Sequence, residues 1–241
     1  MNIIMPYKID WETKLLQKHP GLKHDITAAI KILGNVPFDK LRGNEFAPGL
    51  HHICYPGISY PNFGGIDFPC LIHNGDPNRD TILIVGEAPR RNKYAINKEK
   101  PCSLGSPYGI IFKEYPDQCW VYKQVFESLL DKGFNLYLTD ADKIWTNQKL
   151  AKKLPFDNNK ILEEEINGIK YVKIVTFGRH ARDMVYRILK RTSLPSKCSH
   201  LYHPSQRNYE RWLKEKGVNS IDDIPKVIVD KIIKNVDMFN P

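Results

Sequence analysis

Apolar residues along the chain gather in short runs that are separated by longer stretches of mixed polarity. Residues 81–85, 135–139 and 171–177 are largely apolar runs, typical of strands that are buried on both faces of a sheet. A fourth, shorter strand is predicted near residues 199–202. Strands that alternate with helices indicate a parallel sheet with helices on both faces. The pattern therefore predicts an α/β fold, a three-layer αβα sandwich with a central four-stranded parallel sheet.

The stretches between and after these runs have the spacing of amphipathic helices. Residues 118–132 carry apolar side chains at helical intervals, and Gly133 is placed to end that helix. The same spacing predicts helices over residues 10–34 (two, because Pro20-Gly21 interrupts the pattern), 157–168, 179–191, 206–216 and 221–236.

The chain divides into two parts at about residue 80. Residues 35–80 are rich in Gly, Pro, Asn and His and form a long irregular stretch with short strands. We expect residues 1–80 to be a helical and irregular extension packed on the core. Residues 81–241 form the α/β domain, and 241 residues suffice to bury a real core.

Composition limits the partners and the redox chemistry. The formal net charge of +9 favours a polyanionic partner such as nucleic acid. Five widely spaced cysteines without a CxxC pair argue against disulfides, and the His and Cys groups at residues 51–73 and 198–203 lack zinc-site spacing. We therefore expect no metal and no cofactor. Because neither a membrane-spanning run nor a signal peptide is visible, we expect a cytoplasmic protein.

The chemistry of such a fold should lie where the strands end. In open parallel sheets, ligands bind in the crevice at the carboxyl ends of the strands. The residues at these ends are Gly86-Glu87-Ala88-Pro89, Thr139-Asp140-Ala141-Asp142-Lys143, Gly178-Arg179-His180-Ala181 and His203-Pro204-Ser205.

These four segments, in this order, resemble the motifs of the uracil-DNA glycosylase superfamily. The nearest pattern is that of the microbial branch whose first motif reads GEAPG or GEGPG. The matching segments are residues 82–89 (strand and first turn), 106–109 (the segment whose aromatic ring stacks on the base), 138–140, 175–181 and 202–205 (Tyr-His-Pro-Ser). The resemblance covers about residues 80–212.

The resemblance implies a DNA glycosylase, a hydrolase that acts on N-glycosyl bonds. Such an enzyme flips a nucleotide out of the stack into a pocket, and negative charge collects on the departing base. His203 would stabilise that charge. Tyr108 would stack on the base and Asp140 would read its edge, while backbone N–H groups of the turn Gly86, Glu87, Ala88 and Pro89 would hold its oxygens.

The resemblance also implies contacts with double- or single-stranded DNA by a monomer. Pro204 and Ser205 resemble the loop that pushes into the minor groove. Basic residues that could meet phosphates flank the two motifs, namely Arg90, Arg91, Arg207 and Arg211.

The sequence departs from the superfamily pattern at three points. Ala88 stands where some branches carry the water-activating Asp or Asn, which leaves Asn92 or Glu87 to position water. Asp140 replaces the base-reading Asn; an ionised Asp only accepts hydrogen bonds and would favour the amino group of cytosine or adenine over uracil O4. Lys143 follows the second strand where the iron–sulfur branch has a cysteine, so we expect no cluster.

Each candidate residue also has a structural interpretation. His203 could be a loop histidine with a satisfied hydrogen bond, and Tyr108 could be a core aromatic residue. Glu87 could cap the following turn or pair with an arginine. Arg207 and Arg211 could be solvated helix charges.

Three functions remain open at the level of the sequence. The first is base excision in DNA repair by the residues above. The second is a catalytically silent relative that binds nucleic acid or a nucleobase in the same pocket. The third is hydrolysis of a free nucleoside or another small nucleobase compound.

Overall fold

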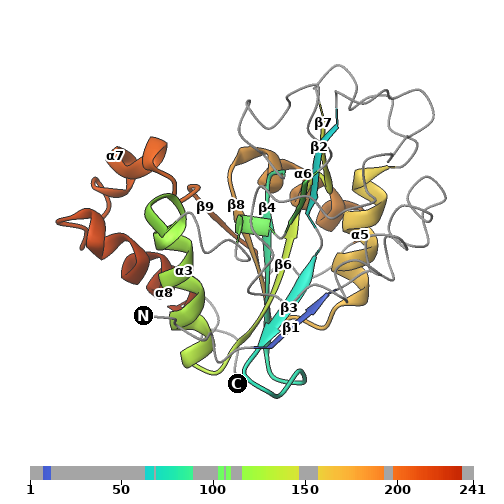
Figure 1. Ribbon diagram of the computed structural model, residues 1–241, viewed down its shortest axis with the longest axis horizontal. Coiled ribbons are helices and arrows are strands. Elements are labelled where there is room, and N and C mark those ends of the chain that lie inside the picture. The colour runs from blue at the N-terminus through green and yellow to red at the C-terminus, as the bar shows by residue number, and fades with distance from the viewer. Residues whose placement is uncertain are drawn as a thin grey trace.

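A mixed sheet runs through the middle of the molecule (Figure 1). The computed structural model describes residues 8–11, 63–67, 69–88, 103–105, 107–109, 116–146, 157–192 and 198–234. Within them, the sheet contains six strands in the order β1-β3-β6-β4-β8-β9. Their bounds are β1 Lys8–Trp11, β3 Cys70–His73, β4 Thr81–Gly86, β6 Asn135–Asp140, β8 Lys173–Phe177 and β9 Cys198–Leu201.

The four strands predicted from apolar runs are confirmed as β4, β6, β8 and β9, and they lie side by side and parallel. All residues of β4, β6 and β8 are buried, as expected for strands covered on both faces. The register pairs Gly86 with Asp140 and Val85 with both Thr139 and Thr176. This register brings the ends of β4, β6 and β8 to the same edge of the sheet.

Two antiparallel strands from the N-terminal part of the chain extend the sheet. β3 pairs with β6, and β1 pairs with β3. The helix predicted to begin at residue 10 is wrong at its start, because Asp10 and Trp11 belong to β1. Backbone pairing with β3 decides this local structure, and the Asp10 carboxylate lies 3.1 Å from Nε2 of His73. The rest of that predicted helix lies outside the described residues.

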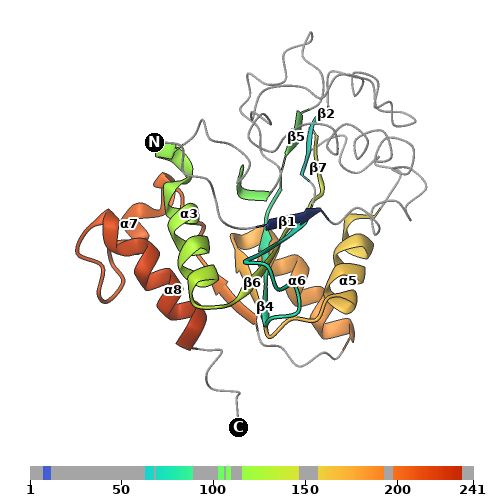
Figure 2. The ribbon, with the colours of Figure 1, turned by 60° about the horizontal axis from the view of Figure 1, so that its bottom comes forward.

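Helices cover both faces of the sheet (Figures 1 and 2). On one face, α3 (Pro116–Asp131) and α8 (Ile224–Lys234) pack on strand residues such as Ile82, Ile84 and Leu138. On the other face, α5 (Asn158–Gly168) and α6 (Arg179–Thr192) pack on Leu83 and Val85. The alternation of side chains along each strand thus divides the core into two apolar layers. No helix in the described part of the chain is long and apolar enough to cross a bilayer.

Gly133 ends α3 as the sequence predicts, and a side-chain cap that was not predicted begins α5. Gly133 has φ +91°, and its N–H bonds to the Leu130 carbonyl oxygen at the end of α3. The Asp157 side chain accepts a hydrogen bond from the Asn159 N–H at the start of α5. The predicted helix 206–216 is instead broken into the 3₁₀ turn η4 (Gln206–Asn208) and the short α7 (Tyr209–Trp212), and η5 (Ile221–Asp223) precedes α8.

A smaller sheet lies beyond the carboxyl ends of the parallel strands. It contains β2 (Phe63–Asp67), β5 (Ser103–Gly105) and β7 (Ile144–Thr146), in the order β5-β2-β7. Both ribbon views place it on that side of the main sheet (Figures 1 and 2). Because β7 begins four residues after β6 ends, the loop between them lies directly under this smaller sheet.

A buried ion pair joins β6 to α5 just below the strand ends. The side chains of Lys143 and Glu165 are fully buried, and the ammonium group bonds to the Glu165 carboxylate, to the Thr139 hydroxyl and, at 2.6 Å, to the Asp140 carbonyl oxygen. Glu165 also accepts a hydrogen bond from the Tyr137 hydroxyl at 3.3 Å. Burial raises the pKa of Glu165, whereas Lys143 and the hydroxyl donors oppose that shift. The pair is therefore held by a complete set of polar partners.

A second buried lysine joins the sheet to α8. Lys173 is 1 % exposed, and its ammonium group donates to the carbonyl oxygen of Ile232, 2.7 Å away in the last turn of α8. Burial lowers its pKa to about 8. A lysine at this position satisfies a carbonyl that the helix itself leaves without a partner.

We predict that Lys143→Met lowers the free energy of unfolding by about 3–5 kcal/mol, because it leaves the Glu165 carboxylate buried without its counter-charge. The double variant Lys143→Met/Glu165→Met should recover a large part of that loss, since neither charge is then buried. Urea denaturation of the wild type, both single variants and the double variant measures this. Additive losses in the double variant would contradict the coupling.

Candidate functional site

The ends of β4 and β8 lie at the point where the strand order reverses. After β4 the chain passes to β6 on one side, and it then returns across β4 to β8 on the other side. Connections that leave in opposite directions open a crevice at the carboxyl edge, where doubly wound folds bind ligands. Gly86, Glu87 and Gly178 occupy this place.

Three of the predicted residues converge at Gly86. A Cβ atom on Gly86 would lie 2.2 Å from Oδ1 of Asp140 and 3.0 Å from the Tyr108 hydroxyl oxygen, closer than any real Cβ contact permits for the carboxylate. The N–H of Ala141 bonds to the Gly86 carbonyl oxygen at 2.8 Å, which continues the pairing of β4 and β6 into their loops. Glycine at position 86 thus makes room for a carboxylate and a phenol at the same spot.

Tyr108 reaches this spot from the short 3₁₀ turn η3 (Pro107–Gly109), where its φ is +64°. Its ring packs against Tyr122, Phe126 and Phe177, with centroid distances of 4.7, 5.4 and 6.0 Å. Its hydroxyl is buried, with no hydrogen-bond partner among the described residues. The ring therefore belongs to a core aromatic cluster, and stacking on a base stays a prediction.

The Tyr108 hydroxyl stays protonated. Burial raises its pKa well above the usual value, and the negative charges of Asp140 and Glu87 raise it further. A left-handed backbone at a non-glycine residue and an unpaired buried hydroxyl each cost free energy. Both features occur in one residue at the strand ends, which marks it as a functional candidate.

His203 is joined to the same cluster by Tyr122. The Tyr122 hydroxyl lies 2.6 Å from Nε2 and 2.8 Å from Nδ1 of His203, and the two rings are nearly perpendicular. Tyr122 is itself 4 % exposed. The His203 carbonyl oxygen accepts a hydrogen bond from the Asn208 side chain at 2.9 Å, which holds the loop. Tyr108 and Tyr122 thus form a continuous chain of contacts from Gly86 to His203.

Sequence reasoning missed Tyr122. Its spacing of four residues from Phe126 places it on the buried face of α3, but its partner His203 lies 81 residues further along the chain. No local pattern indicates that contact.

Glu87 caps the helix after β8. Its Oε1 accepts a hydrogen bond from the backbone N–H of His180 at 3.2 Å. A Cβ atom on Gly178, where φ is +94°, would lie 2.6 Å from the same oxygen. A carboxylate at the N-terminus of α6 is favoured by the helix dipole. Glu87 thus caps α6, a distant helix, whereas the sequence suggested a cap of the turn directly after Glu87. This anion site is filled by the chain itself.

A second polar contact ties the start of α6 to the loop after β6. Nε2 of His180 lies 3.0 Å from the Asp142 carboxylate, and this hydrogen bond raises the pKa of His180. The N–H of Asp142 bonds to the Glu87 carbonyl oxygen at 3.0 Å. The three loops after β4, β6 and β8 are therefore fastened to one another.

Part of the predicted site lies outside the described residues. These positions are Pro89, Arg90, Arg91 and Asn92, so their roles in holding the base, contacting DNA and positioning water stay predictions. Ala88 is half-buried beside them.

The His-Pro-Ser loop is more enclosed than expected. Pro204 is buried and Ser205 is half-buried, so a contact of this loop with DNA would fall to Ser205. Arg207 is exposed. The Arg211 guanidinium lies 5.4 Å from the centroid of the Tyr202 ring, which itself packs edge-on against Trp212. Arg211 is therefore engaged with an aromatic ring, and its contact with phosphate stays a prediction.

β9 carries one cysteine, Cys198, and one histidine, His200. Nδ1 of His200 lies 3.1 Å from the Thr176 hydroxyl, and burial lowers the pKa of His200. Burial raises the pKa of the Cys198 thiol to about 11, which argues against a nucleophilic thiolate. Over the residues that the structure describes, no three His, Cys, Asp or Glu side chains are placed to hold a metal ion.

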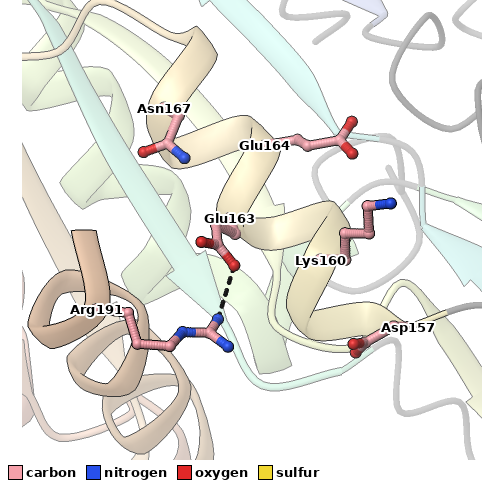
Figure 3. Close-up of a pocket in the computed structure, with 6 residues that line it drawn as sticks. All are labelled: Asp157, Lys160, Glu163, Glu164, Asn167 and Arg191. Carbon is pink, nitrogen blue, oxygen red and sulfur yellow. Dashed lines mark hydrogen bonds and ion pairs between the residues drawn. The ribbon is translucent and has the colours of Figure 1, made fainter.

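A cavity of about 440 Å³ lies away from the strand ends, on the outer surface of α5 (Figure 3). Its lining is polar and largely paired within the chain. Arg191 of α6 reaches the Glu163 carboxylate at 2.7 Å, and the Asp157 side chain caps α5. We therefore place the candidate site at the strand ends and not here.

Comparison of the chain with models of known protein families, with curated proteins and with solved structures finds no match.

We predict that Gly86→Ala displaces Asp140 or Tyr108 and lowers the free energy of unfolding by about 1–3 kcal/mol, because the new methyl group overlaps the carboxylate. Gly168→Ala is the matched control, since nothing lies within 4 Å of a Cβ atom there. Its stability should stay within about 0.5 kcal/mol of the wild type. Equal stabilities of the two variants in urea denaturation would disprove the close approach.

Proposed function

We propose that the chain is a DNA glycosylase-like protein of the uracil-DNA glycosylase superfamily, which hydrolyses the N-glycosidic bond of a flipped base in DNA repair. One observation supports this above the others. The segments that resemble the superfamily motifs contribute Gly86, Tyr108, Asp140 and His203, and contacts link all four at the carboxyl ends of the strands.

The arrangement of the sheet also supports the finer fold assignment. Four parallel strands lie in the order β6-β4-β8-β9, with a helix pair on either face. We extend this to the three-layer αβα sandwich of that superfamily, with β1 and β3 as additions at one edge.

In this proposal His203 stabilises the departing base. A neutral imidazole has one donor and one acceptor nitrogen. The Tyr122 hydroxyl lies near both ring nitrogens. In the proposal it donates to the acceptor nitrogen and so sets the tautomer, and the ring turns when substrate binds, so that its N–H meets a base oxygen. A donor held in place before negative charge develops lowers the barrier because it need not reorganise during the reaction. Tyr122 is then a positioning residue.

Asp140 and Tyr108 would recognise the base edge together. A carboxylate at Asp140 accepts hydrogen bonds, whereas the protonated Tyr108 phenol donates one. An acceptor and a donor side by side complement a base that carries an amino group next to a ring nitrogen or carbonyl. Cytosine-like and adenine-like bases fit when Asp140 faces their amino group, whereas the O4 of uracil in that position would face a second acceptor.

A catalytically silent base-binding protein is the second candidate. The Glu87 carboxylate accepts a hydrogen bond from the backbone N–H of His180, and Ala88 has no polar side chain. Hydrolysis would then depend on Asn92. If that amide does not position water, the same pocket would bind a base without releasing it.

We predict that the wild type releases a base that carries an amino group, such as an alkylated adenine or cytosine, from labelled duplex or single-stranded oligonucleotides, detected as strand scission after alkali. Oligonucleotides carrying uracil, hypoxanthine or xanthine complete the panel and should be cleaved more slowly. His203→Ala should lower the rate about 100-fold or more, as loss of a transition-state donor does. Salt-sensitive binding without scission in the wild type would favour the silent protein.

Tyr122→Phe should lower the same rate about tenfold while preserving the ring packing. It should also move the acid limb of the pH–rate profile to higher pH, because losing a donor to the neutral imidazole disfavours that form. Tyr171→Phe, which removes a half-buried hydroxyl just before β8 and outside the candidate site, serves as the control. A lower rate with an unchanged pH profile would show that Tyr122 is only structural.

We predict that Asp140→Asn raises the preference for uracil over cytosine about tenfold, because an amide can donate to uracil O4 where a carboxylate cannot. Competitive binding of oligonucleotides that carry either base measures this ratio. Asp142→Asn is the matched control, since that neighbouring carboxylate contacts His180. An unchanged ratio in Asp140→Asn would remove Asp140 from base recognition.

A further inference from the structure

One face of α6 combines positive charge with an exposed aromatic ring. We call it the α6 stripe, and it contains Arg179, Arg182, Tyr186, Arg187 and Lys190, all exposed. Their intervals of three and four residues place them along one side of the helix. The opposite side carries the apolar residues that pack on the sheet, including Met184, Val185 and Ile188.

The charge of the stripe is only partly compensated within α6. Asp183 is the one carboxylate of this helix, and it contacts Arg182 at 2.7 Å and Arg179 at 3.7 Å. Arg191, at the end of α6, instead turns toward α5 and pairs with Glu163 (Figure 3). Four cations of the stripe thus face solvent against a single acid, and the side chain of Arg179 is 86 % exposed.

Tyr186 is unusual among the large apolar side chains of the described residues. It is 66 % exposed, more than Tyr202, Leu213 or Ile221. It lies four residues after Arg182 and four before Lys190, so cations flank the ring on both sides along the helix. Basic side chains that track a phosphate backbone, with an aromatic ring between them for a base, are the usual elements of single-strand binding.

We propose that the α6 stripe binds a single-stranded segment of nucleic acid, with its cations on successive phosphates and a base stacked on Tyr186. The helix rises about 1.5 Å per residue, so Arg179 and Lys190 lie about 16 Å apart along its axis, a length of several nucleotides. The stripe begins directly after Gly178, whose turn holds Glu87 at the strand ends. A strand bound along α6 therefore leads to the candidate site.

The same features argue against a membrane surface as the partner of the α6 stripe. An interfacial helix buries an apolar face in the lipid, but the apolar face of α6 is already buried in the protein. A duplex offers its phosphates but keeps its bases stacked, so it would gain nothing from Tyr186. The partner best matched to both the charges and the ring is an unpaired strand.

The test measures binding of the full-length chain to fluorescein-labelled oligo(dT) by fluorescence anisotropy across a salt series, so it does not depend on base excision. Arg179→Glu/Lys190→Glu should weaken binding at least tenfold. It should also flatten the slope of log affinity against log salt by about 1.4, the value for two lost single-strand phosphate contacts. Lys132→Glu/Lys226→Glu makes the same charge change on exposed lysines beside α3 and in α8, and it should weaken binding less than threefold.

The aromatic contribution needs its own variants. Tyr186→Ala should weaken oligo(dT) binding about fivefold or more, while Tyr186→Trp should preserve it. Thermal unfolding of every variant confirms that these exposed substitutions leave the fold intact.

Three outcomes would overturn the proposal. The first is equal loss of binding in the two double variants, which would indicate only general charge attraction. The second is a duplex of the same length that binds more tightly and is unaffected by Tyr186→Ala. The third is binding to phosphatidylserine–phosphatidylcholine vesicles without binding to oligo(dT). If oligo(dT) binds at the stripe but no substrate is cleaved, this inference stands and the proposed function fails.

Discussion

The geometry of the strand ends depends on a single positive charge placed inside the protein. The Lys143 ammonium group is fully buried, and its partners come from β6 and α5. Burying a charge costs free energy unless a counter-charge or hydrogen-bond acceptors surround it, and Lys143 has both. This requirement allows one docking position of α5 against β6. Because Lys143 also binds the Asp140 carbonyl oxygen, the same requirement orients the residue whose side chain lies over Gly86.

At successive strand ends across the sheet, a carboxylate side chain lies over a glycine. The Asp140 side chain covers Gly86 of the next strand, and the Glu87 side chain covers Gly178 of the strand after that. Each glycine provides the space that the neighbouring carboxylate fills. The backbone bonds of Ala141 and Asp142 to the β4 loop, together with the Glu87 bond to the start of α6, close this row. These backbone contacts hold together the loops that carry both carboxylates.

The sequence predicts this arrangement only in part. There is a physical reason why some elements can be predicted and others cannot. β4, β6 and β8 are predictable because strands buried on both faces must be apolar throughout, and Gly133 is predictable because its backbone conformation favours glycine. β1 cannot be predicted in this way, because its four residues form a strand only by pairing with β3, which lies far along the chain. Glu165 lies in a helix rich in charged residues, and its counter-charge lies 22 residues away. Tyr122 likewise has no local signal for its contact with His203. Long-range polar partners, unlike apolar periodicity, leave no trace in the sequence near either residue.

The charges at the strand ends constrain the proposed chemistry further. Glu87, Asp140 and Asp142 gather there in a chain whose overall charge is positive. Such a group repels phosphates, so in the proposed complex the phosphates of the strand would lie on surrounding basic surfaces such as the α6 stripe. It also favours positive charge near the strand ends, and glycosidic cleavage passes through a cationic sugar. A carboxylate need not activate water to assist that step, since a fixed negative charge stabilises a cation at the reacting centre. The negative charge of Glu87, Asp140 and Asp142 therefore favours, in the proposed reaction, both a base that carries an amino group and a cationic transition state.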